Sequence, residues 1–222
     1  MATSYSPKII TDGLVLCLDA GDRKSYSGSG TTWTDRSGNG HNCTLDSSEV
    51  SLVENQKTLY FNTGISTISG PSTPNAFTTF SAFKKIGTQT NVYHVILGGR
   101  THEMSIRDNS TLRVSTHTNG SDQTLDITSS SSGYDLLDGN WHFITSRYDG
   151  TNLKAFIDTE HVGTRSVSGT TSDSRKVIRI GCWENNDYQA NGYIPFVYMY
   201  DRALTDEEIL QNYNATKGRF GL

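Results

Sequence analysis

The chain has 222 residues, of which 34% are hydrophobic and 19% are charged, and its formal net charge is −4. This length is common for a single all-β sandwich or barrel, so we expect one domain over residues 1–222. The chain has no run of Lys or Arg, which argues against a nucleic-acid-binding surface. No apolar stretch approaches the roughly 20 residues needed to cross a bilayer, so membrane insertion is not expected either.

Short alternating or apolar runs, separated by turn residues, extend along the chain and predict strands. The clearest runs are 13–19, 58–62, 77–84, 92–98, 103–107, 111–117, 141–149, 152–158, 176–182 and 193–201. Two polar segments, 64–75 with its prolines and the serine run 129–133, are predicted to be surface loops. This pattern predicts an all-β fold in which two antiparallel sheets form a sandwich.

The clearest hairpin spans residues 141–158, where two alternating runs flank the turn signal Asp149-Gly150. In the first run Phe143 faces one way, whereas Ile144 and Tyr148 face the other. Both faces therefore carry apolar groups, and we expect the hairpin near the middle of a stack of two sheets.

One helix is predicted near the carboxyl end, over about 206–217. Thr205 is a suitable N-cap, and Glu208, three residues later, completes a capping box. Gly218 is expected to end the helix. The narrow apolar stripe of this helix predicts packing across an end or edge of the sandwich, and its members are Ile209, Leu210 and Tyr213.

The three cysteines, Cys17, Cys43 and Cys182, are odd in number and too few for a disulfide framework. We therefore expect free thiols and folding in a reducing compartment. The first seven residues contain no basic segment followed by an apolar one, so no signal peptide is predicted. Synthesis in the cytoplasm of a host cell, without secretion by the general route, is the expectation.

Three ordered segments resemble a known family. They are the hairpin with Trp141-His142 and Tyr148-Asp149-Gly150, the early stretch 12–22 followed by 33–40, and the late stretch 180–209. Together they resemble the laminin-G-like branch of the concanavalin A-like lectin/glucanase superfamily. The resemblance implies a jelly-roll sandwich that binds glycans or proteins, with hydrolases in some branches. One departure is Asp158-Thr159, where the family usually has Asp-Gly, so we expect a different turn type there.

The end of the chain, Lys217-Gly-Arg-Phe-Gly221, is similar to that of proteins common in tailed bacteriophages of aquatic bacteria. This resemblance implies a virion protein, either a decoration or a tail-fibre component. Nothing in the composition by itself requires a virus.

Catalytic motifs are not found. A retaining glycosidase needs two carboxylates about 5–5.5 Å apart, which a strand supplies at alternate positions of one face. The Glu-x-Asp-x-x-Glu pattern of hydrolases in this superfamily is absent, as are lyase, P-loop and nucleophile-elbow motifs. The acidic cluster 206–208 is a helix start, so we do not expect an enzyme.

Calcium is the candidate metal because jelly rolls of this superfamily often hold it, and it needs six to eight oxygen ligands. The candidate ligands are Asp19, Asp22, Asp35 and Asp201. An alternative for Asp35, which precedes Ser-Gly-Asn-Gly, is that its carboxylate caps its own turn. We prefer that turn interpretation.

The candidate ligand site is the segment 183–191, which mixes aromatic, amide and carboxylate side chains between two predicted strands. Sugar binding needs an aromatic face for C–H groups and planar polar groups for hydroxyls. The alternative is that Trp183 continues the preceding strand into the core and leaves an ordinary polar loop. Arg100–Glu103 could line a neighbouring groove. The candidate ligand-binding residues are Trp183, Asn185, Asn186, Asp187 and Tyr188.

Three functions fit these observations. The first is a non-enzymatic, virion-associated domain that recognises a glycan or another cell-surface component. The second is a structural decoration or fibre protein that binds other virion subunits. The third is a divergent glycan hydrolase or lyase.

Overall fold

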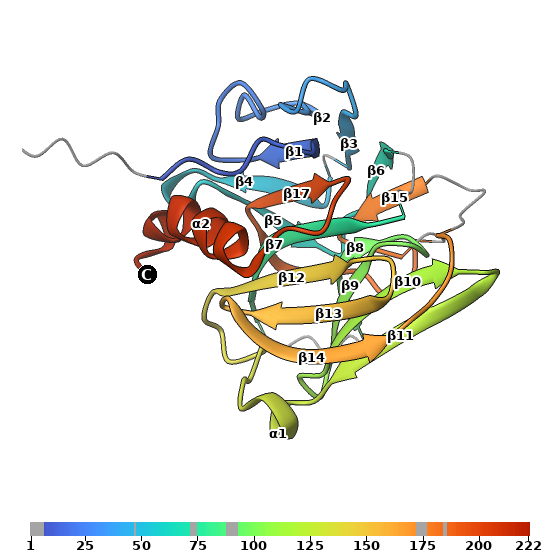
Figure 1. Ribbon diagram of the computed structural model, residues 1–222. Coiled ribbons are helices and arrows are strands. Elements are labelled where there is room, and N and C mark those ends of the chain that lie inside the picture. Colours follow the sequence, from blue (N-terminus) through green and yellow to red (C-terminus); the bar gives the residue numbers. More distant parts are fainter. Residues whose placement is uncertain (1–6, 47, 72–74, 88–92, 172–176, 184–185) are drawn as a thin grey trace, which may run out of the picture.

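The computed structural model describes residues 7–46, 48–71, 75–87, 93–171, 177–183 and 186–222. Two antiparallel sheets pack face to face (Figure 1), so the predicted all-β sandwich is confirmed. Within the described residues, none of the helices has both the length and the apolar character needed to span a bilayer.

The first sheet has nine strands among the described residues. Its main path, in spatial order, is β14 (Glu160–Ser166), β13 (Asn152–Ile157), β12 (His142–Tyr148), β7 (Phe77–Lys85), β16 (Asn191–Ile194), β5 (Thr58–Asn62) and β4 (Val50–Val53). Strand β17 (Phe196–Tyr200) also pairs with β7, and β1 (Leu14–Asp19) pairs with β17.

The second sheet has eight strands in the described part of the chain. Their spatial order is β11 (Ser121–Ile127), β10 (Leu112–Thr118), β9 (Glu103–Arg107), β8 (Tyr93–Gly98), β15 (Val177–Ile180), β6 (Ser66–Ser69), β3 (Cys43–Leu45) and β2 (Thr32–Trp33). The helical elements are η1 (Glu54–Gln56), α1 (Ser129–Ser132), α2 (Asp206–Thr216) and η2 (Lys217–Phe220).

Every predicted strand run contains a strand, but two details differ. The run 193–201 is interrupted at Pro195, which has no amide hydrogen for a ladder, so β16 and β17 pair with different ends of β7. Two predicted loops were wrong: 64–75 contains β6, and 129–133 forms the single turn α1, capped by the Thr128 side chain. Strands β2, β3, β4, β11 and β14 were not predicted.

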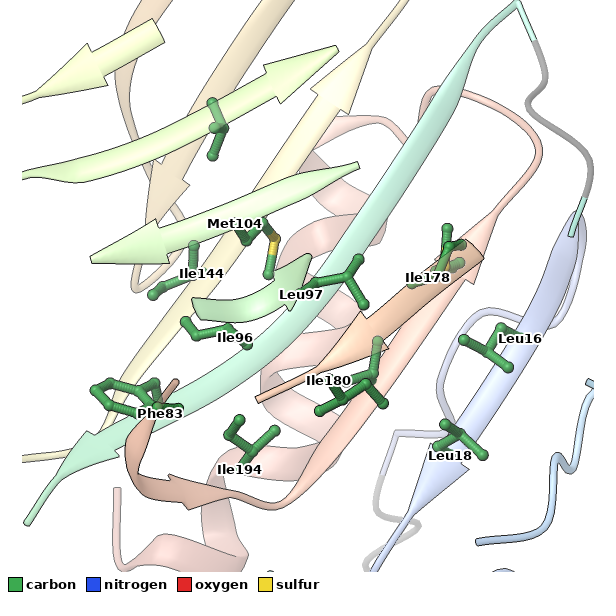
Figure 2. Packing of buried hydrophobic residues seen from close by; sticks show 14 of the residues in the cluster. Leu16, Leu18, Phe83, Ile96, Leu97, Met104, Ile144, Ile178, Ile180 and Ile194 are labelled. Atoms are coloured by element: carbon green, nitrogen blue, oxygen red, sulfur yellow. The ribbon is translucent and has the colours of Figure 1, made fainter. Parts of the chain in front are cut away.

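The main core lies between the two sheets. Figure 2 shows apolar side chains from both sheets converging there, among them Leu16, Leu18, Phe83, Ile96, Leu97, Met104, Ile144, Ile178, Ile180 and Ile194. All ten are at most 4% exposed, so each contributes nearly its full apolar area.

A second apolar cluster covers the outer face of the first sheet. Phe80, Phe143 and Phe196 pack there against Leu204 and Ile209 of the helical segment. This cluster explains why both faces of the 141–158 hairpin are apolar: Ile144 and Tyr148 face the other sheet, while Phe143 faces α2. The hairpin is thus buried on both faces, but it lies toward the β14 edge of its sheet, and a helix rather than a sheet covers its second face.

Helix α2 begins as predicted, because Thr205 and Glu208 form a reciprocal capping box. Three other expectations for this helix were wrong. It packs on the outer face of the first sheet rather than across an end or edge. Leu210 is 45% exposed and does not join the apolar stripe. Gly218 does not end the helix, because α2 is followed at Lys217 by η2, which contains Gly218 and ends at Gly221 with φ 78°.

Candidate functional site

A cavity of about 200 Å³ lies where the loop after β15 meets the outer face of the second sheet. Strands β8 to β11 supply its floor and one wall, and the loop supplies the other. The lining residues are Tyr93, Val95, Glu103, Arg113, Ser115, Asp122, Thr124, Trp183 and Tyr188.

Strand alternation explains the polar floor. On β9 and β10 the residues Met104, Ile106 and Val114 point into the core, so their neighbours point outward. The register pairs Ser115 with Glu103 on one side and with Thr124 on the other. The polar floor is thus built from three adjacent strands.

The loop closes on itself and is fixed to β8. The amide of Trp183 donates to the carbonyl of Asp187 over 2.8 Å, and the amide of Asn186 donates to the carbonyl of Trp183 over 2.9 Å. The carbonyl of Tyr188 accepts from the Val95 amide at 3.3 Å. These bonds bring Trp183 and Tyr188 to the same cavity.

Close approach of the loop to β8 depends on Gly98. A Cβ atom at this position would lie 2.1 Å from the Cys182 carbonyl oxygen and 2.9 Å from the Trp183 Cα. Real Cβ atoms do not approach backbone so closely, and any larger residue would push the loop away from the sheet.

Tyr188 is held in an unusual way. Its backbone has φ 55°, a left-handed conformation that costs a bulky residue about 1–3 kcal/mol. Its side chain is 48% exposed, so burial of the ring does not offset that cost. The ring meets Tyr93 edge to face, with 4.8 Å between centroids. The strain presents an exposed aromatic ring at the mouth of a polar cavity.

Glu103 is a buried carboxylate in this cavity, with 9% of its surface exposed. One carboxylate oxygen accepts from the Ser105 hydroxyl at 2.8 Å and the other from the Ser115 hydroxyl at 2.9 Å. Burial raises the pKa of Glu103, and the two serine hydrogen bonds and the charge of Arg113 oppose that shift only in part.

Arg113 forms a fixed wall beside Glu103. Its guanidinium donates two parallel hydrogen bonds to Asp126, at 2.7 and 2.8 Å, and lies over the Tyr93 ring at 5.8 Å. The hydrogen bonds from Arg113 are the main reason that the pKa of Asp126 is lowered, although burial opposes them. The side chain of Arg113 is therefore held in place, and the carboxylate of Asp126 balances its positive charge.

The structure brings some predicted ligand residues together. Trp183 and Tyr188 line the cavity, while Asn186 and Asp187 are exposed on the same turn. Asn185 lies outside the described residues. In the segment 100–103, Glu103 lines the cavity as we expected for a neighbouring groove. His102 of that segment is buried away from it.

Sequence reasoning missed the part of the cavity that the second sheet supplies. The missed lining residues are Tyr93, Val95, Arg113, Ser115, Asp122 and Thr124. The alternation of Arg113 and Ser115 with apolar neighbours marks an exposed strand face. Which loop lies over that face depends on tertiary packing.

The candidate calcium ligands have other partners. Asp35 is 7% exposed and accepts hydrogen bonds from the amides of Cys17, Ser37 and His41, which is the turn-capping role that we preferred. Asp19 accepts from the Tyr198 hydroxyl and pairs with Arg219 at 2.8 Å.

Asp22 pairs with Arg36 at 3.4 Å, and Asp201 is exposed after β17. Among the described residues, no group of three or more His, Cys, Asp or Glu side chains could hold a metal ion. Calcium binding stays a prediction.

The chain belongs to the concanavalin A-like lectin/glucanases superfamily, because the model of that family matches residues 58–210. The laminin-G-like resemblance of the sequence is thereby confirmed. Among curated proteins, none matches this sequence.

Several solved structures share the fold. Botulinum neurotoxin type C, which depends on two ganglioside molecules to get into cells, has a TM-score of 0.69 and 17% identity over 92% of this chain and 52% of its own. The binding domain of botulinum neurotoxin DC, in complex with rat synaptotagmin II, has a TM-score of 0.68 and 16% identity over 92% and 52%.

The binding domain of Paraclostridial Mosquitocidal Protein 1 has a TM-score of 0.67 and 16% identity over 91% of this chain and 52% of its own. This chain therefore spans about half the length of these structures. At such identities the likeness establishes the fold and nothing finer.

Proposed function

We propose that this chain is a non-enzymatic, virion-associated binding domain that recognises a glycan or another cell-surface component. The observation that carries the proposal is Tyr188, an exposed ring on a strained backbone beside a polar cavity. Strain that is not offset by burial is typical of binding sites. An aromatic face next to carboxylate and hydroxyl groups is the combination that sugars require.

The solved structures of the same fold support this proposal by analogy. One interacts with two ganglioside molecules, and another is in complex with rat synaptotagmin II. A place in a virion is proposed from the resemblance of Lys217–Gly221 to phage proteins. Mass spectrometry of purified particles tests that part, and absence of the chain from them would contradict it.

The binding proposal is tested on a glycan array, followed by titration of the best ligand against Tyr188→Ala. Loss of the exposed ring is expected to cost about 1–3 kcal/mol of binding free energy, which lowers affinity about fivefold to 150-fold. The matched control is Leu210→Ala, which truncates another exposed apolar residue far from the cavity and should leave affinity unchanged.

Binding that is unaffected by Tyr188→Ala would remove this cavity from the proposal. No glycan binding, with tight association with a virion protein, would favour the structural alternative. Shortened products released from a polysaccharide would favour the hydrolase or lyase alternative.

A further inference from the structure

Glu103 is a buried carboxylate without an ion-pair partner among the described residues. Its two oxygens each accept one serine hydrogen bond, whereas an ionised carboxylate can accept about four. In the part of the chain that the structure describes, no Lys, Arg or His forms an ion pair with it. Buried charges in proteins are normally paired or bound to metal, so a positively charged donor on a ligand suits the remaining hydrogen-bond capacity of Glu103.

The charges around Glu103 leave the cavity acidic. The positive charge of Arg113 is already matched by its two hydrogen bonds to Asp126, and Arg107 also pairs with Asp126 at 3.4 Å. Asp122 lines the cavity too, and its partner is the ring of His117. The charged side chains that line the cavity itself are two carboxylates, Glu103 and Asp122, and one guanidinium, Arg113.

Aromatic rings complete the surroundings. Tyr93, Trp183 and Tyr188 line the same cavity as Glu103. The negative face of an aromatic ring attracts an ammonium group, and a carboxylate between such rings adds a charge-assisted hydrogen bond. An acetylated amine carries no charge to match Glu103, and an acidic sugar would be repelled by it.

We infer that this cavity selects a glycan through a free, positively charged amino group, so that its ligand is an amino sugar that is not acetylated. This inference rests on the proposed glycan-binding function and specifies the ligand for the same cavity. The ammonium donates to Glu103, and the sugar ring lies against Tyr188.

The test uses array members that are identical except at one ring position, which bears a hydroxyl, an N-acetyl group or a free amine. The amine member is expected to bind about tenfold or more tightly than the other two, because a hydrogen bond to a charged group is the stronger kind. Equal or tighter binding of the hydroxyl or N-acetyl member would overturn the inference and leave the proposed function standing. Binding of no array member would overturn both.

Two variants locate the selectivity. Glu103→Gln keeps the shape of the side chain and removes its charge, so it should abolish the preference for the amine member over the hydroxyl member. Glu207→Gln makes the same change in net charge on exposed helix α2 and should preserve the preference. Loss of preference in both variants would mean that overall charge, rather than this cavity, selects the ligand.

A pH titration of the unmodified protein gives a second measurement that does not depend on folding of a variant. Between about pH 6 and pH 4 an amine stays protonated, so only protein groups titrate. Because the pKa of Glu103 is raised, affinity for the amine member should fall as the pH is lowered, while binding of the hydroxyl member changes little.

The charged and titratable groups around Glu103 are Tyr93 on β8, Arg107 on β9, Arg113 and His117 on β10, and Asp122 and Asp126 on β11. The same pH titration of Glu103→Gln separates the effect of Glu103 from that of these other groups, because the variant lacks only the Glu103 carboxylate. Constant affinity across this range in the unmodified protein would contradict a role for Glu103.

Discussion

His102 is completely enclosed, and its ring meets Phe77 edge to face with 4.4 Å between centroids. Neither ring nitrogen has a hydrogen-bond partner among the described residues. Burial lowers the pKa of His102 to about 3 because the charged ring would lie in an apolar surrounding. The folded protein therefore keeps this ring neutral at pH values where the unfolded chain protonates it.

Replacing His102 tests this effect. Below about pH 6.5 His102 is protonated in the unfolded chain, whereas in the folded chain it stays neutral down to about pH 3. The free energy of unfolding therefore falls as the pH falls through this range. His102→Leu should reduce this loss by up to about 1.4 kcal/mol per pH unit, measured by urea unfolding between about pH 6.5 and pH 4. Leu210→Ala, at an exposed position without a titratable group, is the control and should not alter the slope.

The pKa of His142 is shifted in the opposite direction to that of His102. Burial lowers the pKa of its ring, but Asp158 at 3.0 Å and Asp138 at 3.2 Å outweigh burial and leave the pKa raised. Its contribution to stability is present at low pH and is lost as the pH rises through that raised pKa.

An unchanged pH dependence of the free energy of unfolding in His102→Leu would mean that His102 is not the source of the loss of stability at low pH.

Among the elements, the β13–β14 hairpin shows how tertiary contacts fix a local conformation. Asp158 and Thr159 at its turn have φ 49° and 78°, although we expected a turn type different from that of Asp-Gly. Positive φ at both central residues is the arrangement that Asp-Gly favours. The contacts of Asp158 explain why this turn adopts positive φ. Its carboxylate accepts a hydrogen bond from the Phe143 amide at 2.7 Å and contacts the His142 ring.

Thr159→Gly should therefore stabilise the protein. Threonine is branched at Cβ and is strained at positive φ, whereas glycine is not, so the free energy of unfolding should rise by about 1 kcal/mol in urea. Thr164→Gly, an exposed position within β14, should lower it by about 0.5–1 kcal/mol. A loss of stability in both variants would show that the turn is not strained.

At the scale of the whole molecule, most strands of five or more residues were predictable because alternation over that length is a local signal. The exceptions are β11 and β14, which have seven residues each but are mostly exposed and lack apolar alternation. Strands β2, β3, β4 and β6 have only two to four residues, and their pairing partners, not their periodicity, make them strands. Helix α2 was predicted from its cap, but the face that it covers depends on the aromatic cluster of the first sheet.

The same distinction applies to the candidate site. Trp183 and Tyr188 were predicted because aromatic and amide residues are adjacent in one loop. Glu103 and Arg113 belong to strands whose register with the loop is set by long-range pairing, so the sequence by itself does not join them to it.

Burial of the thiols reports on the integrity of the whole fold. Cys17, Cys43 and Cys182 are free and buried, as predicted, and burial raises their pKa values to about 12, about 12 and about 11. The native protein should resist a thiol reagent at neutral pH. In denaturant, without prior reduction, it should react with three equivalents. Fewer equivalents would indicate a disulfide.

The order of strands in the two sheets has a consequence for the way this chain folds. Strand β1 joins its sheet through β17, the pair β4 and β5 joins through β16, and β2, β3 and β6 join through β15. In Figure 1 the blue and cyan strands of the first third are accordingly bordered by orange and red strands. Among the described residues, no strand of the first third therefore pairs with a strand of the middle third.

Loops that close over such distances are entropically costly, and folds dominated by them form slowly. During synthesis the middle hairpins can assemble as they leave the ribosome, whereas the amino-terminal strands must wait for β15, β16 and β17. The strands that join the first third to the rest are β15, β16 and β17, so neither sheet can close before residues 177–200 have been synthesised.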